Sequence, residues 1–137
     1  MKIHARLALP LLLVAAACNP ANAIPAAEAT VARFHQQYNQ QQLDAIYGGT
    51  TASFKENTSR ADFGKFAGAV RRKLGAEVGT ARSGWNVQAL AGGTFVTVTY
   101  DTRFEKGPGV ETFRVRVSGK TGQLDGYNIN SSTLITD

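Results

Sequence analysis

The sequence predicts an α+β domain in which N-terminal helices pack on a curved four-stranded antiparallel meander sheet. As far as Gly75, apolar residues recur at the three- and four-residue spacing of helices. After Gly75, apolar and polar residues alternate in four segments that glycine-containing turns separate. Helices that precede strands in this way are typical of domains whose helices cover one face of a sheet. The 137 residues and 43% hydrophobic content suit a single domain, which we place at 25–137.

The beginning of the chain has the pattern of an export signal. Lys2 and Arg6 give the N-terminus a positive charge, and an apolar run of 11 residues follows at 7–17. That run is too short to span a bilayer, and its length suits the hydrophobic part of a secretory signal. We therefore predict that the protein is exported.

Two cleavage sites fit this leader. The stretch 15–18, which ends at Cys18, resembles the lipobox of bacterial lipoproteins. That resemblance implies a signal peptide at 1–17, acylation of the Cys18 thiol and a tether at 18–24. The single cysteine of the chain stands at the end of the apolar run, which favours this interpretation. The alternative is the stretch 21–23, an A-x-A signal for ordinary signal peptidase, where cleavage after 23 would release a cysteine-free protein.

The lipoprotein resemblance also implies a location. In lipoproteins of Gram-negative bacteria, aspartate after the cysteine retains the protein at the inner membrane, whereas this chain has Asn19. The resemblance therefore implies an outer-membrane protein that is held by its acyl chains, palmitate among them, and faces the periplasm. The alternative cleavage implies a soluble periplasmic or secreted protein. Export also makes nucleic acid an unexpected partner, although the formal net charge is +5.

The helical part should begin near Pro25, since proline suits the first turn of a helix. An apolar stripe then runs along this helix, made of Ala27, Val31, Phe34 and Tyr38. A short second helix is expected over 43–47. We expect a connector at 50–58, with Phe54 as its buried anchor.

A further helix is expected to start after the N-cap Ser59 and to end at Gly75. Its predicted core residues, spaced three and four apart, are Phe63, Phe66, Val70 and Leu74. Basic residues at 71–73 lie in its last turn, where positive charge stabilises the helix dipole.

Four strands are expected at 78–90, 94–104, 110–117 and 124–135. In the second strand, Val96, Val98 and Tyr100 share one face, and Asp101 and Arg103 share the other. This alternation predicts a sheet with one covered face and one wet face.

The sequence contains few residues or motifs that indicate catalysis, cofactor binding or metal binding. One cysteine excludes an intramolecular disulfide framework and any multi-cysteine metal site. No glycine-rich phosphate loop is present, so we predict no cofactor and no metal. His35 stands beside Phe34, and we expect it to flank the apolar stripe as a surface or partly buried packing residue.

Several short motifs resemble an uncharacterised family of small bacterial lipoproteins. They are Phe34-x-x-x-Tyr38, the stretches 44–47, 73–75 and 126–131, and Trp85. The order of elements is similar to the nuclear-transport-factor-two-like cone fold. The resemblance implies that fold but no activity, because the wider superfold hosts isomerases, dehydratases, hydrolases and pure binding modules.

Two groups of residues are candidates for binding. Aromatic side chains with polar tips can line a pocket or a partner surface, and the alternative is that they fill the seam between helices and sheet. These candidate pocket residues are Tyr38, Tyr47, Trp85, Tyr100 and Tyr127. The arginines of the wet face form a candidate interaction surface for an acidic partner or lipid headgroups, and the alternative is a solvated face with cross-strand pairs to Glu111 or Asp101. These arginines are Arg103, Arg114 and Arg116.

The function that follows is an exported, lipid-anchored binding or interaction domain with no catalytic activity. Its expected partners are the membrane, through the anchor, and a protein or small apolar ligand, with a homodimer as a further expectation. The alternative is a small-molecule enzyme of isomerase or hydrolase type that uses a pocket in the cone. Such a site would need a carboxylate beside a tyrosine, and Tyr38 with Asp101 is the pair considered, although Asp101 shares the polar face.

Overall fold

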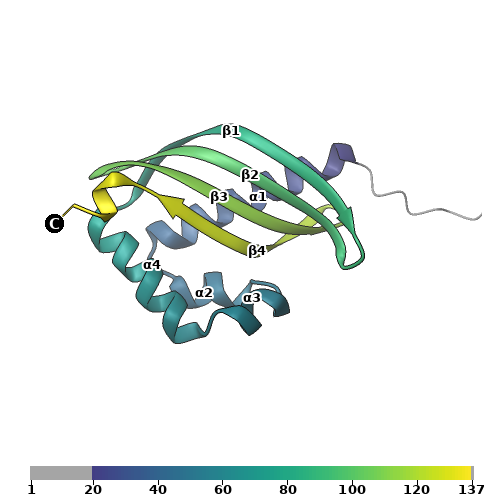
Figure 1. The fold of residues 1–137 in the computed structure, drawn as a ribbon, viewed down its shortest axis with the longest axis horizontal. Coiled ribbons are helices and arrows are strands. Elements are labelled where there is room, and N and C mark those ends of the chain that lie inside the picture. Colours follow the sequence, from purple (N-terminus) through teal and green to yellow (C-terminus); the bar gives the residue numbers. More distant parts are fainter. Residues whose placement is uncertain (1–19, 137) are drawn as a thin grey trace, which may run out of the picture.

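The structure, a computed structural model, describes residues 20–136 and consists of helices followed by a sheet (Figure 1). The helices are α1 (Pro20–Asn39), α2 (Leu43–Gly48), α3 (Ala52–Asn57) and α4 (Arg60–Leu74). The strands are β1 (Glu77–Leu90), β2 (Gly93–Phe104), β3 (Gly107–Ser118) and β4 (Thr121–Asn130), and a 3-10 turn, η1 (Ser132–Leu134), follows. The predicted α+β class and the order of its elements are confirmed.

Helix α1 begins five residues before the expected start, so residues 20–24 of the expected tether are helical. Pro25 lies inside the helix and supplies no backbone donor there. Ala23 and Ala26 are buried in the core, and this burial stabilises the first turns. The predicted stripe of α1, from Ala27 to Tyr38, is buried as expected.

The connector expected at 50–58 contains helix α3. Thr51 is its N-cap, because the Thr51 hydroxyl accepts a hydrogen bond of 3.2 Å from the backbone N–H of Phe54. The same hydroxyl donates to Asp125 of β4 at 2.6 Å and so attaches the helix to the sheet. Phe54 is buried, as the sequence predicts.

Helix α4 has the predicted ends. Ser59 caps it by accepting a hydrogen bond from the N–H of Asp62, and Gly75 closes it with a φ of 78°. One predicted core residue was wrong: Phe66 is 42% exposed. Ala67, one position later, is buried instead, because Phe63, Ala67, Val70 and Leu74 are spaced four, three and four residues apart and share one face of the helix.

The sheet is an antiparallel meander in the order β1-β2-β3-β4, as predicted. Side chains of β2 and β3 alternate between buried and exposed, so one face is covered and the other is wet. The last strand ends at Asn130, earlier than expected. Ser131 accepts a hydrogen bond from the N–H of Thr133 there and donates one of 2.6 Å to the carbonyl of Pro108, which starts the 3-10 turn.

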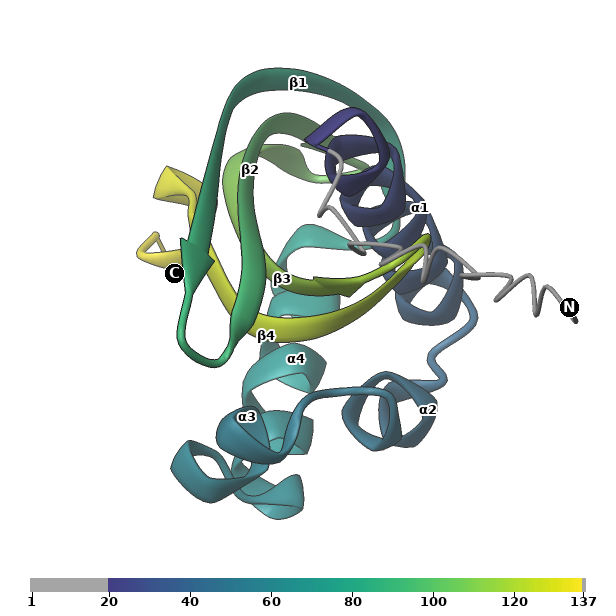
Figure 2. The same cartoon turned by 90° about the vertical axis from the view of Figure 1, so that its right-hand side faces the viewer.

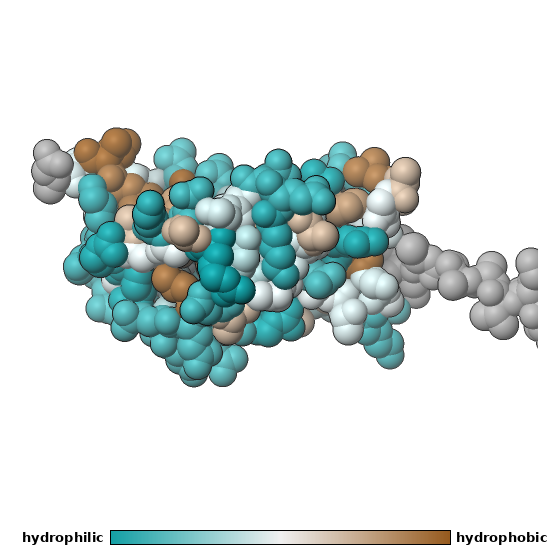
Figure 3. Space-filling view, turned by 90° about the horizontal axis from the view of Figure 1, so that it is seen from below, coloured by the Kyte–Doolittle hydropathy of each residue, from teal (hydrophilic) through white to brown (hydrophobic). Residues whose placement is uncertain are grey.

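Helix α1 lies on the inner side of a curled sheet (Figure 2). Viewed from one end, β1 and β2 arch over α1, and α2, α3 and α4 lie together beneath β4 (Figure 2). The side that carries these three helices is mainly hydrophilic, and apolar residues appear there as separate spots (Figure 3). No helix among residues 20–136 is long and apolar enough to cross a membrane.

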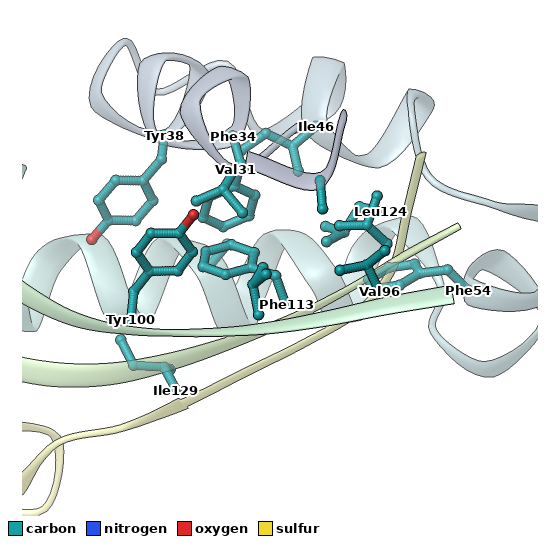
Figure 4. Close-up of a cluster of buried hydrophobic side chains, with 14 of the residues drawn as sticks. Val31, Phe34, Tyr38, Ile46, Phe54, Val96, Tyr100, Phe113, Leu124 and Ile129 are labelled. Carbon is teal, nitrogen blue, oxygen red and sulfur yellow. The ribbon is translucent and has the colours of Figure 1, made fainter. Parts of the chain in front are cut away.

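The core lies between α1 and the sheet. Val31 and Phe34 of α1 point toward Phe113 and Tyr100 of the strands (Figure 4). The ring centroids of Phe34 and Phe113 are 5.1 Å apart in an edge-to-face arrangement, which aromatic pairs favour. Because α1 reaches all four strands, this one layer of side chains joins the whole sheet to the helix.

Candidate functional site

A buried carboxylate lies on the helix-facing side of the sheet. Glu111 of β3 has no exposed surface, and its oxygens accept three hydrogen bonds from side chains. Glu111 Oε1 lies 2.7 Å from His35 Nε2 and 2.6 Å from Thr102 Oγ1. Glu111 Oε2 lies 2.6 Å from the hydroxyl of Tyr127. We call these four residues the Glu111 cluster.

The strand register brings three members of the cluster together. Glu111 pairs with Tyr100 on β2 and with Ile129 on β4. Thr102 and Tyr127 are two residues away from those partners and on the same face, so each is a diagonal neighbour of Glu111. Helix α1, which packs on this face of the sheet, contributes His35. The cluster therefore ties α1 to three consecutive strands.

Burial and hydrogen bonding decide what this cluster can do. A buried carboxylate is stable only when donors compensate for lost hydration, and here both oxygens have them. Burial raises the pKa of Tyr127 well above its usual value, and the negative charge of Glu111 raises it further. Tyr127 therefore remains a protonated donor to Glu111. The arrangement holds a charge in place inside the core, and little acceptor capacity of the carboxylate is left for a substrate.

The cluster was missed in the sequence, although the signals were present. His35 is 6% exposed, so the expectation of a surface or partly buried flanking residue was wrong. Its positions relative to Val31 and Tyr38, four and three residues away, already put it on the buried stripe. Glu111 has the same strand parity as the buried Phe113 and therefore points toward the helices.

The candidate pocket residues do not line one pocket. Tyr38, Tyr100 and Tyr127 join the aromatic packing around Phe34 and Phe113. These contacts fill the seam between helices and sheet, which was the alternative to a pocket.

The two other candidates lie elsewhere. Tyr47 packs in a second aromatic group with Phe54 and Phe63, and its hydroxyl donates to the carbonyl of Thr58 at 2.9 Å. Trp85 is 58% exposed on β1. The five aromatic residues therefore do not come together around one pocket.

Tyr38 and Asp101 do not converge either. The Tyr38 hydroxyl donates to the carbonyl of Gly75 at 2.8 Å, inside the core. Asp101 is exposed on the outer face of β2, as its place in the alternation indicated. The carboxylate that does meet a tyrosine is Glu111, with Tyr127.

A groove of about 670 Å³ lies on the outer face of the sheet, away from the helices. It crosses all four strands at the end of the sheet where β4 leads into η1. Its floor includes one row of paired residues, Ala81, Asp101, Val110 and Asn130. Arg103 lines the next row. The volume is in the range of ordinary ligand sites, and the lining mixes charged, polar and apolar groups.

The three candidate arginines are exposed on this outer face but do not form one stripe. Arg103 pairs with Pro108, which is six residues from Arg114 along β3, a separation of about 20 Å. Arg114 is bound to Asp125 at 3.3 Å and stacks on Phe95 at 4.4 Å. Only Arg103 belongs to the groove.

The cross-strand pairs with Glu111 or Asp101, which were the alternative for these arginines, are absent among residues 20–136. For Glu111 the reason is direct, because its side chain points to the opposite face of the sheet. Asp101 and Arg103 take part in no ion pair within the described part of the chain, so both charges of the groove are free to meet a ligand.

The described residues contain no group of histidine, cysteine and carboxylate side chains that could hold a metal ion. No protein-family model matches this chain, and no curated protein sequence matches it either.

Proposed function

We propose that this chain is an exported, lipid-anchored binding domain that receives a segment of a protein partner in the outer groove. One observation carries the proposal. The seam between helices and sheet is filled by aromatic side chains and the Glu111 cluster, whereas the opposite face has an open groove of about 670 Å³. Binding on this face needs no rearrangement of the core.

The start of α1 supports acylation at Cys18. Cleavage after residue 23 would cut inside the helix and remove Ala23, which is buried in the core. Cleavage before Cys18 leaves α1 complete. Acyl chains on that cysteine would then hold the protein at a membrane, since each buried CH₂ contributes about 0.8 kcal/mol. We place it at the outer membrane, facing the periplasm.

The arrangement of elements supports membership of the lipoprotein family with the nuclear-transport-factor-two-like cone. A long first helix lies within a curled four-stranded sheet, and α4 helps to enclose the same core (Figure 2). Proteins with this superfold have many different functions, so membership of the family would imply a fold but no particular activity.

The lining of the groove favours a polypeptide over a small apolar ligand. Asp101 and Arg103 offer opposite charges, and Asn130 and Ser132 offer hydrogen-bonding groups. Val110 is exposed between them and can cover an apolar side chain. A peptide segment with charged and apolar side chains matches this mixture, whereas a purely apolar ligand would leave the charges unpaired.

The proposal is tested in cells that express the full chain. Cys18→Ser should abolish both incorporation of labelled palmitate and membrane fractionation. Benzoylphenylalanine in place of Val110 should give one defined crosslinked adduct, and the same group in place of the exposed Gln88, outside the groove, should not. Arg103→Glu should remove the Val110 adduct. Equal adducts at the two positions, or an adduct that survives Arg103→Glu, would contradict groove binding.

The Glu111 cluster favours a second candidate, an isomerase- or hydrolase-type enzyme. Its specific observation is a buried carboxylate hydrogen-bonded to a tyrosine, a pair that can exchange a proton with a substrate. That use requires a substrate to displace Tyr127 or His35 from the carboxylate. Turnover of a β,γ-unsaturated ketone or a 4-nitrophenyl ester, lost in Glu111→Gln with the fold retained, would establish the enzyme. Equal rates with and without the protein would reject it for these two substrate classes.

A further inference from the structure

Three segments meet at one end of the molecule, which we call the anchor end. It consists of the first turns of α1 (20–27), the β1–β2 turn with its flanks (86–97) and the β3–β4 turn with its flanks (115–124). In Figure 1 this end lies on the right, opposite the C-terminus. The outer groove lies at the other end of the strands.

Close packing joins two of these segments. A Cβ atom on Gly122 of β4 would lie 3.1 Å from the carbonyl oxygen of Ala26 and would also meet Thr30. Arg33 donates to the carbonyl of Gly122 at 3.1 Å. The β3–β4 turn is therefore held against the beginning of α1, and the two present one common surface.

The charge of this surface has one sign. The three segments contain Arg116 and Lys120 and no aspartate or glutamate. Neither cation takes part in an ion pair within residues 20–136. Arg116 lines a hollow of about 250 Å³ together with Ser118, Thr121 and Gln123, whose polar groups can reach a phosphate oxygen. Leu90 is 50% exposed on the neighbouring turn.

The lipid anchor would enter the membrane beside this surface. Cys18 precedes Pro20 by two positions, so their Cα atoms are at most about 8 Å apart. We infer that the anchor end rests on the phosphate headgroups of the membrane in which Cys18 is anchored, with Arg116 and Lys120 against the phosphates and Leu90 among the lipids. This inference rests on the lipid anchor of the proposed function.

The orientation of the groove follows. Thr94 at the anchor end and Arg103 in the groove are nine residues apart along β2, which corresponds to about 30 Å. With the anchor end on the membrane, the groove faces away from the bilayer and is open to a partner in the surrounding space.

The single tryptophan makes this testable. The acylated full chain is placed in vesicles of phosphatidylethanolamine and phosphatidylglycerol, with and without bromine on the acyl chains. In a Trp85→Phe background, Leu90→Trp should show a blue-shifted emission that brominated lipid quenches and that iodide in the water does not reach. Ala91→Trp provides a second probe on the same turn if Leu90→Trp folds poorly. Val110→Trp, in the distant groove, is the matched control and should stay open to iodide and unaffected by bromine.

The charge is tested in the same background. Arg116→Gln together with Lys120→Gln should restore iodide access to the probe at position 90, because each cation near an anionic surface strengthens contact about fivefold. If iodide quenches the tryptophan at position 90 as strongly as the one at position 110, the membrane contact is overturned. Shielding that the two glutamines leave unchanged would overturn the headgroup recognition.

Measurement of palmitate on Cys18 in the same preparation distinguishes failure of the membrane contact from failure of the proposed lipid anchor. Acylated protein with an exposed turn would contradict the inference alone. Absence of palmitate on Cys18 would remove the lipid anchor, and the inference with it.

Discussion

His35 of α1 and Glu111 of β3 are 76 residues apart in the chain, and their side chains lie 2.7 Å apart in the core. Thr102 and Tyr127 complete the hydrogen bonding of the same carboxylate. Since a carboxylate is strongly hydrated in the unfolded chain, the folded state needs all these donors to bury it. The pair therefore couples the position of α1 to the formation of the sheet.

The first prediction concerns the carboxylate. Glu111→Leu should lower the free energy of unfolding by about 3–5 kcal/mol, because it leaves His35, Thr102 and the partly buried Tyr127 without their acceptor. Urea denaturation followed by circular dichroism measures it. Glu56→Leu, on the exposed surface of α3, is the control and should change stability by less than about 0.5 kcal/mol. Similar midpoints for both variants would mean that the Glu111 cluster contributes no net stability.

The second prediction concerns high pH. Burial raises the phenol pKa values of Tyr38, Tyr100 and Tyr127 above the usual value near 10. A raised pKa in the folded state means that the contribution to stability is complete below about pH 10 and is lost as the pH rises further. Titration followed at 295 nm should therefore show these phenols ionising later in the native protein than in concentrated urea. Coincident curves would contradict their burial.

A third prediction tests the contact between β4 and α1. Gly122→Ala should destabilise the protein by about 1–3 kcal/mol, because the added Cβ would lie 2.7 Å from Val115 Cγ1 and 3.1 Å from the carbonyl oxygen of Ala26. Thermal unfolding measures the change. Gly48→Ala is the matched control, since nothing lies within 4 Å of a Cβ there. If the two variants melt alike, α1 does not pack against the β3–β4 turn in this way.

The fourth prediction compares two residues of α4. Leu74→Ala should cost about 2–5 kcal/mol because Leu74 is fully buried. Phe66→Ala should cost clearly less, since Phe66 is 42% exposed, although its ring lies 6.1 Å from that of Tyr127. Chemical denaturation of both variants gives the comparison. A larger loss for Phe66→Ala would show that the buried face of α4 is assigned incorrectly.

Local patterns accounted for most of the fold. The spacing of Val31, Phe34 and Tyr38 predicted the buried side of α1, and the alternation around Val96 and Val98 predicted the covered face of β2. These predictions hold because helix and strand periods decide locally which side chains share a face.

The candidate site was much less predictable. Residue type suggested that His35 and Glu111 were polar surface residues, although their periodicity put both on buried faces. Periodicity predicts which face of a helix or strand a side chain lies on, but it does not predict the hydrogen-bond partner of that side chain. That partner decides whether a polar group can be buried. Trp85 shows the reverse case, because an aromatic residue on the inward side of an edge strand is left uncovered where the helices do not reach it.

The amino-acid sequence alone predicted the order of the main helices and strands, the caps of α4 and the two faces of the sheet, because these depend on residues a few positions apart. Only the tertiary structure decided which side chains meet across long separations. It joined Glu111 to His35 and Tyr127, left Arg103 without an acidic partner among residues 20–136, and formed the groove on the outer face. The physical reason is that burial of charge and the shape of a surface depend on how whole elements pack, and that packing is absent from any short stretch of the chain.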